Sequence, residues 1–265
     1  MLRRTSVNLT FFLILLAALP AFGRVQTGFL DRTVTVSGVT YHYQVYVPAD
    51  FHSKKKWPVI LFLHGAGERG ADGLLPTDVG IAHAIRLDSS RFPFVVVMPQ
   101  CLKDKIWGEP DMQAQALAAL DASIKDFHGD RKRVYLTGLS MGGFGTWELA
   151  VSNPGRFAAL VPICSGVRPQ KDWPQLRVTA SDDPKITDPH AEVARRIGST
   201  PVWMFHGDAD QAVPVEESRH MAEALKAAGG NFKYTEYPGV NHNSWDKAYA
   251  EPELVPWLLS QSLRH

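Results

Sequence analysis

The chain has 265 residues, of which 45% are hydrophobic and 21% charged, and its formal net charge at pH 7 is +1. This composition is typical of a globular protein and excludes an intrinsically disordered one. The balanced charge excludes the broad basic field on which nucleic-acid binding depends, and the length suits a single domain with a large core.

The first 23 residues differ in kind from the rest. Arg3 and Arg4 precede an almost wholly apolar run over residues 9–19, and Ala21 and Gly23 are the small residues that a signal peptidase reads. This pattern is that of a secretory signal peptide, and the apolar run is shorter than the about 20 residues of a membrane span. We expect residues 1–23 to be a signal peptide of a secreted or periplasmic protein, with an uncleaved membrane anchor as the alternative. We expect residues 24–265 to form a single domain.

The predicted strands after the leader are of two kinds. Residues 29–38 and 40–48 are β-rich runs joined at Ser37-Gly38, which predicts an antiparallel hairpin. Continuous apolar runs predict parallel strands covered on both faces, and there are five, "PVILFLHG", "PFVVVMPQ", "RVYLTG", "AALVPIC" and "PVWMFHG". The more alternating "NFKYTEYP" predicts a final edge strand.

Helical patterns fall between these strands. "DMQAQALAALDASIKDF" follows an Asp cap, "GGFGTWELAVSN" stops at Asn153-Pro154, and "PVEESRHMAEALKAAGG" opens with Pro214 in the first turn. Strands alternating with helices predict an α/β fold, a mostly parallel, doubly wound sheet with an N-terminal antiparallel hairpin. In such sheets the functional crevice lies at the carboxyl ends of the strands.

The first chemical motif is "FLHGAGERG", directly after the first parallel strand. Its small residues allow backbone N–H groups to approach an acyl oxygen, as in an oxyanion hole. We expect the Ala66 N–H to be one donor, with Gly67 as the alternative. Farther along, Trp107 is a candidate for lining a substrate pocket.

"TGLSMGG" is the strongest local signal, since Gly138-Leu139-Ser140-Met141-Gly142 is a G-x-S-x-G motif between a strand and a helix. A nucleophile on such a tight turn has a strained backbone, and side chains two residues either way would collide with it. Ser140 is therefore the predicted nucleophile, and the Met141 N–H is the predicted second oxyanion donor.

Both cysteines, Cys101 and Cys164, follow predicted strands. The expected sheet order separates those strands by two others, about 14 Å at 4.7–4.9 Å per step, so we expect free thiols. Residues 165–200 then make a long, proline-containing connection, which is either a cap over the site or a packed surface loop.

"FHGDADQAVP" at residues 205–214 has two interpretations. His206, Asp208 and Asp210 alternate as metal ligands on an extended segment would, or the loop supplies the acid of a serine hydrolase. A catalytic zinc commonly takes three protein ligands and a water, and no H-E-x-x-H motif or further histidine cluster accompanies His206, so we expect no metal. His206 and His64 both precede a glycine at a strand end, where an imidazole ring most often ties loops together.

His242 is the histidine on the loop after the last predicted strand, in "NHNSW". The order serine, acid, histidine, each after a later strand, is the order of the doubly wound hydrolases. Trp245, three residues after His242, is the second candidate pocket residue, and Trp173 is a further aromatic of the same kind.

Together "LHGAGERG", "GLSMGGFGTW", "VPIC", "HGDADQAVP" and "NHNSW" resemble the secreted esterases of the phospholipase/carboxylesterase branch of the α/β-hydrolase superfamily. These proteins are often labelled predicted peptidases and stand near feruloyl esterases and dienelactone-hydrolase-like proteins. The resemblance covers the chain from Trp57 onward and implies Ser140 as nucleophile, His242 as base and Asp210, of D-x-x-V-P, as acid. The family's connection corresponding to residues 165–200 is shorter, so the resemblance does not specify the substrate.

The sequence therefore predicts a secreted serine carboxylic-ester hydrolase that needs no cofactor and acts on a small-molecule ester. A serine peptidase acting on short peptides is the alternative among enzymes. A ligand-binding relative without turnover is the alternative from another class.

Overall fold

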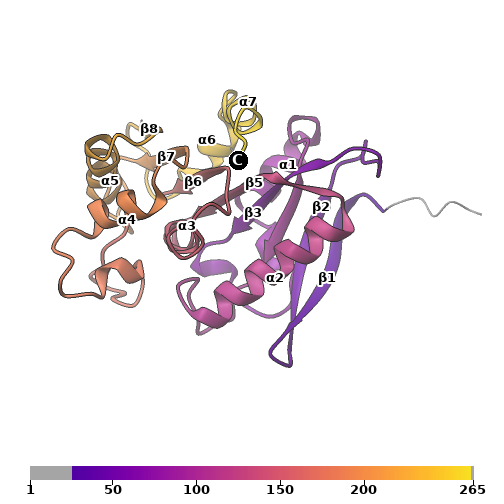
Figure 1. Cartoon of the computed structure of the whole chain (residues 1–265), viewed down its shortest axis with the longest axis horizontal. Helices are drawn as coiled ribbons and strands as arrows, with labels where there is room; N and C mark the ends of the chain where they lie inside the picture. The colour runs from indigo at the N-terminus through magenta and orange to yellow at the C-terminus, as the bar shows by residue number, and fades with distance from the viewer. Residues whose placement is uncertain (1–25, 264–265) are drawn as a thin grey trace, which may run out of the picture.

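The computed structural model describes residues 26–263, so the predicted signal peptide at residues 1–23 lies outside the described residues. Within them an eight-stranded sheet carries helices on both faces (Figure 1). The strands are β1 (Gly28–Val36), β2 (Val39–Val47), β3 (Trp57–Leu63), β4 (Val95–Pro99), β5 (Gly129–Leu139), β6 (Ala159–Ile163), β7 (Val202–Gly207) and β8 (Phe232–Tyr237). The α-helices are α1 (Gly80–Leu87), α2 (Pro110–Asp126), α3 (Met141–Ser152), α4 (Pro189–Ile197), α5 (Glu216–Ala227), α6 (Trp245–Ala250) and α7 (Leu254–Leu259).

The strands lie side by side in the order β1-β2-β4-β3-β5-β6-β7-β8. β1 pairs antiparallel with β2, and β2 with β4, whereas all neighbours from β4 to β8 are parallel. The predicted hairpin and mostly parallel sheet are confirmed. Because the parallel strands share one direction, their carboxyl ends meet at the same edge of the sheet, and the loops there form the site described below.

The core has two layers because side chains alternate across each strand. All seven residues of β3 are buried. Val59 and Leu61 pack in the layer beneath α2, α3, α4 and α5, and Ile60 and Phe62 pack in the layer beneath α1, α6 and α7. Each fully buried aliphatic side chain of this kind contributes about 1.5–3 kcal/mol, so a strand covered on both faces keeps almost no polar position.

Two predicted helix starts differ from the structure. The helix α2 begins at Pro110, with Glu109 at the cap position and Asp111 in the first turn, so Asp111 is not the cap. Proline suits this position because a backbone N–H in the first turn of a helix has no partner within the helix, so its absence costs no hydrogen bond. Pro214 precedes α5, whose cap is Val215. Among the helices of residues 26–263, none combines the length and apolar character that crossing a bilayer demands.

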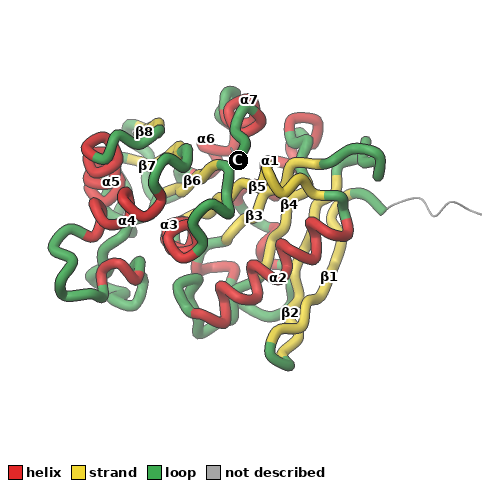
Figure 2. Tube along the Cα trace, viewed as in Figure 1, coloured by secondary structure: helices red, strands yellow, loops and turns green. Residues whose placement is uncertain are grey.

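The connection at residues 165–200 folds around a short 3-10 turn (Thr179–Ser181) and α4 (Figure 2). Buried carboxylates from two helices hold it. Glu148 of α3 accepts hydrogen bonds from Thr179 N at 2.7 Å and Thr179 Oγ1 at 2.9 Å. Glu217 of α5 accepts from Val167 N at 2.7 Å and Arg168 N at 3.1 Å. The connection is therefore anchored to the helical layer on one face of the sheet.

Candidate active site

Ser140 lies between β5 and α3 with a φ of +51°, in the left-handed region that residues other than glycine seldom adopt. Neighbouring backbone groups hold it there, since Ser140 N donates to Ile163 O at 2.9 Å and Ser140 O accepts from Gly143 N at 2.8 Å. A Cβ on Gly142 would come within 1.9 Å of Leu63 O, and one on Gly138 within 2.2 Å of Gly142 O. The glycines of the motif are thus required by close backbone approach.

The Ser140 hydroxyl begins a chain of three side chains from three loops. His242 Nε2 lies 2.9 Å from Ser140 Oγ, and His242 Nδ1 lies 2.7 Å from Asp210 Oδ2. His242 follows β8 and keeps 25% of its side chain exposed, whereas the Asp210 side chain after β7 is fully buried. In this arrangement the imidazole can take a proton from the hydroxyl, and the carboxylate can stabilise the ring once it is charged.

Asp210 is held as a carboxylate by its own turn. Its Oδ1 accepts from Ala212 N at 2.8 Å and Val213 N at 2.9 Å. Burial alone would raise the pKa of Asp210, but hydrogen bonds from His206, His242 and the Val213 amide outweigh it and bring the pKa well below its usual value. Asp210 is therefore ionised at neutral pH.

Hydrogen bonds connect the loop that carries Asp210 to the loop that carries His242. Ala209 N donates to Val240 O at 3.0 Å, and Gln211 N donates to Asn241 Oδ1 at 3.1 Å. Asp208 is exposed and accepts from Gly239 N at 2.6 Å. Asp208 thus bonds the neighbouring loop, and the structure directs Asp210, not Asp208, toward His242.

The metal interpretation of this loop loses its geometric basis, because the Asp208 carboxylate faces Gly239. Within residues 26–263, the group whose candidate ligand atoms all lie within 4.8 Å of one another is Cys164, Asp210 and His242. Burial raises the pKa of the Cys164 thiol well above its usual value. A thiol must lose its proton to bind a metal, so this group is poorly suited to hold one.

The predicted oxyanion donors lie on adjacent segments. Ala66 begins a 3-10 turn (Ala66–Glu68) after β3, and Met141 begins α3. The first turn of α3 lies against the end of β3, since a Cβ on Gly142 would be 2.7 Å from His64 O. Within residues 26–263, neither the Ala66 amide nor the Met141 amide donates a hydrogen bond to another protein group, and Met141 is fully buried.

His64 ties this segment to the next strand, as expected from its place before a glycine. Its Nε2 accepts from Cys101 N at 2.9 Å. Because this ring is fully buried, its pKa is lowered to about 4, so it stays neutral at physiological pH.

The prediction that Trp107 lines a pocket is wrong. Its side chain is fully buried, its Nε1 donates to His64 O at 3.0 Å, and its ring packs on His64 with centroids 5.1 Å apart. A Cβ on Gly145 would come within 2.5 Å of Trp107 Cβ, so the Trp107 side chain packs closely against α3. Trp107 supports the end of β3 from inside the core.

Trp245 is half-buried at the start of α6, and its ring stands perpendicular to that of His242, with centroids 5.6 Å apart. The structure thus brings Trp245 to the site. Trp173, from the connection at residues 165–200, lies under the Arg69 guanidinium at 4.9 Å. Arg69 Nε donates to Ala66 O at 3.0 Å, so the connection touches the segment that carries Ala66.

The parallel sheet, the N-terminal hairpin and the strand–turn–helix around Ser140 define an α/β-hydrolase fold. The chain belongs to the prolyl oligopeptidase family, whose model matches residues 104–260, more than half of its length. Its structure is similar to that of a thermostable esterase, with 32% identity, a TM-score of 0.73 and coverage of 88% of this chain and 63% of the other.

Two curated proteins are also similar. An uncharacterized secreted protein of Arthroderma benhamiae is 28% identical over 205 residues, which are 71% of this chain and 21% of the relative. Acyl-protein thioesterase 1 of Gibberella zeae is 30% identical over 122 residues, which are 46% of each protein. The chain therefore spans less than half the length of these curated relatives.

Proposed function

We propose that this protein is a serine hydrolase that cleaves carboxylic esters through an acyl-enzyme. The observation that carries the proposal is the hydrogen-bonded chain from Ser140 Oγ through His242 to the buried Asp210, with distances of 2.9 Å and 2.7 Å. Such a chain supplies a base for a hydroxyl that is otherwise a poor nucleophile.

In the proposed reaction Ser140 Oγ attacks the ester carbonyl carbon while His242 Nε2 takes the hydroxyl proton. The carbonyl oxygen becomes an oxyanion between the Met141 N–H and the Ala66 N–H, with Gly67 as the alternative donor. His242 then returns its proton to the leaving alcohol. Water, activated by the same ring, releases the acid. Asp210 stays ionised throughout and stabilises the imidazolium. These residues account for each step without a cofactor.

Two relatives favour an ester or thioester over an amide. The structure with 32% identity is that of a thermostable esterase, and the Gibberella zeae relative is an acyl-protein thioesterase. The prolyl oligopeptidase family match favours the second candidate, a peptidase acting on short peptides. We place Trp245 at the rim of the substrate site because its ring stands against His242.

We also propose that residues 1–23 are a cleaved signal peptide, that residues 24–265 form one α/β-hydrolase domain, and that the protein is secreted or periplasmic. The secreted Arthroderma benhamiae relative supports this location. For residues 165–200, the two anchoring carboxylates favour a packed connection over a mobile cap.

The test is turnover of a panel containing a nitrophenyl acetate, a methyl ferulate and a peptide nitroanilide. Wild-type protein should release nitrophenol with a burst, since the activated nitrophenyl ester acylates Ser140 faster than water removes the acyl group. Ser140→Ala should lower kcat by roughly 10³- to 10⁶-fold while circular dichroism stays unchanged. Near-wild-type hydrolysis by folded Ser140→Ala would contradict the proposal, and faster amide than ester turnover would favour the peptidase.

A further inference from the structure

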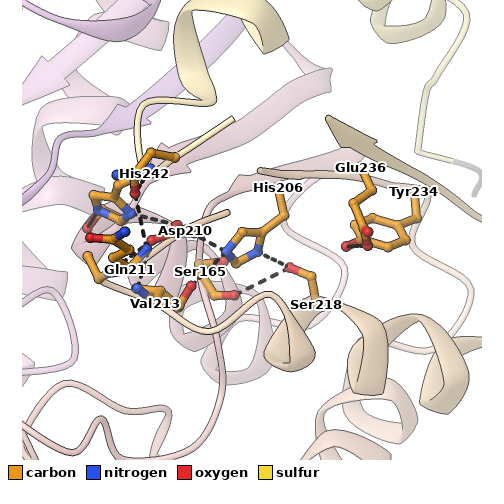
Figure 3. A network of polar contacts seen from close by, with 12 residues as sticks. Ser165, His206, Asp210, Gln211, Val213, Ser218, Tyr234, Glu236 and His242 are labelled. Atoms are coloured by element: carbon orange, nitrogen blue, oxygen red, sulfur yellow. Dashed lines mark hydrogen bonds and ion pairs between the residues drawn. The ribbon is translucent and has the colours of Figure 1, made fainter. Parts of the chain in front are cut away.

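His206 makes a second imidazole contact to Asp210, from the side opposite His242 (Figure 3). The ring is fully buried at the end of β7. Its Nε2 lies 3.1 Å from Val213 O and 3.2 Å from Asp210 Oδ2. Its Nδ1 lies 2.7 Å from Ser218 Oγ of α5.

These partners fix where the ring carries a proton. Val213 O and the Asp210 carboxylate only accept hydrogen bonds, so Nε2 must bear a hydrogen. Ser218 has a hydroxyl that donates or accepts, and its Oγ also lies 3.4 Å from Ser165 O. Whichever way the hydroxyl turns, Nε2 donates its hydrogen to Val213 O, and the same N–H dipole lies beside Asp210, with 3.2 Å between Nε2 and Oδ2.

The contact closes a ring around the acid. Val213 N donates to Asp210 Oδ1, and Val213 O accepts from His206 Nε2, which also faces Asp210 Oδ2. The carboxylate is thereby gripped at both oxygens. Oδ1 accepts from two backbone amides, and Oδ2 lies between the His206 and His242 rings. These contacts restrict rotation of the Asp210 carboxylate and keep Oδ2 facing His242.

The other charged group near His206 is already neutralised. Glu236 is the residue opposite His206 on β8. Its Oε1 pairs with Arg219 Nη2 at 2.6 Å and its Oε2 accepts from Tyr234 Oη at 2.7 Å. In the loop after β6, the Cys164 thiol is kept protonated because burial raises its pKa. Asp210 is thus the unneutralised anion that the ring contacts.

We propose that His206 is a positioning residue for the Ser140–His242–Asp210 arrangement, holding the Asp210 carboxylate in orientation and sharing its negative charge through the Nε2–H. The inference rests on the proposed function. It assigns to His206 a role in the reaction in addition to tying two loops together.

The proposed electrostatic effect of His206 on Asp210 predicts the direction in which the pH profile of activity shifts. A residue with a purely structural role would not shift that profile. When the Nε2–H is removed, Asp210 Oδ2 loses the neighbouring N–H dipole, and its hydrogen bond from His242 Nδ1 is the side-chain contact that stays. The carboxylate then interacts more strongly with His242 and favours its protonated form. The midpoint of the rising limb of activity against pH therefore moves to higher pH.

The experiment compares three variants at position 206. His206→Phe fills the site without a donor. His206→Asn has an amide that stops near the place of Nδ1, whereas His206→Gln places an N–H near that of Nε2. The matched control is His190→Phe, because the buried His190 Nε2 lies 3.1 Å from Glu217 Oε2, a carboxylate that also accepts two backbone amides.

Two readouts are taken across pH for each variant, kcat on a nitrophenyl ester and the labelling rate of Ser140 by a fluorophosphonate, located by mass spectrometry. We expect His206→Phe and His206→Asn to lower kcat by roughly 10- to 100-fold. We expect them to move both midpoints upward by about half a pH unit or more. His206→Gln should stay close to wild type, and His190→Phe should lose stability without moving either midpoint.

The outcomes separate this inference from the proposed function. Wild-type labelling with unmoved midpoints in His206→Phe and His206→Asn would overturn the positioning role alone, as would His206→Gln behaving like His206→Phe. If His206→Phe does not fold, the Asn and Gln pair decides the matter. Failure of wild-type protein to hydrolyse esters or label at Ser140 would overturn the proposed function.

Discussion

At the scale of single residues, Asp208 and Asp210 stand two positions apart and face different partners. Asp210 is buried against His242, whereas Asp208 is exposed and bonds Gly239 N. We expect Asp210→Asn to lower kcat by roughly 10⁴-fold, because the amide no longer holds the required histidine tautomer. Steady-state kinetics on a nitrophenyl ester measures the loss.

Asp208→Asn is the matched control. An asparagine oxygen still accepts from Gly239 N, so kcat should stay near wild type, with a small decrease in the free energy of unfolding. Exchange of these two behaviours would mean that the acid is Asp208 and that the interpretation of the loop is wrong by two residues.

The pH dependence follows from which group has to change its charge. His242 must be neutral to act as a base, and histidine side chains titrate between about pH 5 and 8. Asp210 remains ionised across this range because its pKa is lowered. We expect kcat/KM to rise with pH with the slope of a single deprotonation. The measurement uses an uncharged ester.

A limb that is flat from acid to neutral pH would exclude His242 as the base. A slope that corresponds to the loss of two protons would mean that Asp210 titrates together with His242. Dependence on added zinc, or full inhibition by a chelator, would return the metal hypothesis to consideration.

Sequence-based prediction works better for residues whose position depends on the backbone than for residues whose position depends on side-chain packing. Ser140, Asp210 and His242 follow strands in a fixed order, and the sheet then brings them together. Trp107 was misplaced because its direction depends on how its loop folds back beneath α3. The contact of His206 with Asp210 has only a spacing of four residues as its signal, which ordinary loops share.

At the scale of elements, α5 anchors the connection at residues 165–200 through Glu217. Burial alone would raise the pKa of Glu217, but hydrogen bonds from His190 and the Val167 and Arg168 amides lower it overall. The stabilisation is therefore present above the unfolded value of about 4.5 and lost as pH falls through the folded pKa. Glu217→Gln should cost about 1–3 kcal/mol at pH 7.

Urea unfolding at a series of pH values measures this effect. The difference between Glu217→Gln and wild type should begin to shrink near pH 4.5, where the carboxyl of the unfolded chain gains its proton, and should be lost as pH falls through the lower folded pKa. Because glutamine is nearly the same size as glutamate, a difference that stays constant down to pH 3 would show that hydrogen bonding, and not the charge of the carboxylate, sets the stabilisation.

Elements differ in how well the sequence predicts them. The continuous apolar strands and the longer helices α2, α3 and α5 are predicted, because their patterns extend over many residues. The helices α1, α4, α6 and α7 are missed. They have six to nine residues, too few for isolated helices to be stable, and depend on tertiary packing.

At the scale of the whole molecule, the sheet order keeps the two cysteines apart. Cys101 follows β4 and Cys164 follows β6, with β3 and β5 between them, and both are free and buried. Burial raises the pKa of Cys101 to about 12. We expect two thiols to titrate in denatured, unreduced protein and almost none in the folded protein. No thiols after denaturation would contradict the sheet order.

The place of β8 has a consequence for how the protein fails under stress. β8 pairs with β7 on one side and ends the sheet on the other, yet the loop after it carries His242. Edge elements open by local unfolding at a lower free energy than the core. On the proposed function, activity therefore depends on a part of the sheet that opens at a low free energy. In mild denaturant, the amide protons of β8 should exchange with solvent, and activity should decline, while the central strands β3 and β5 stay protected.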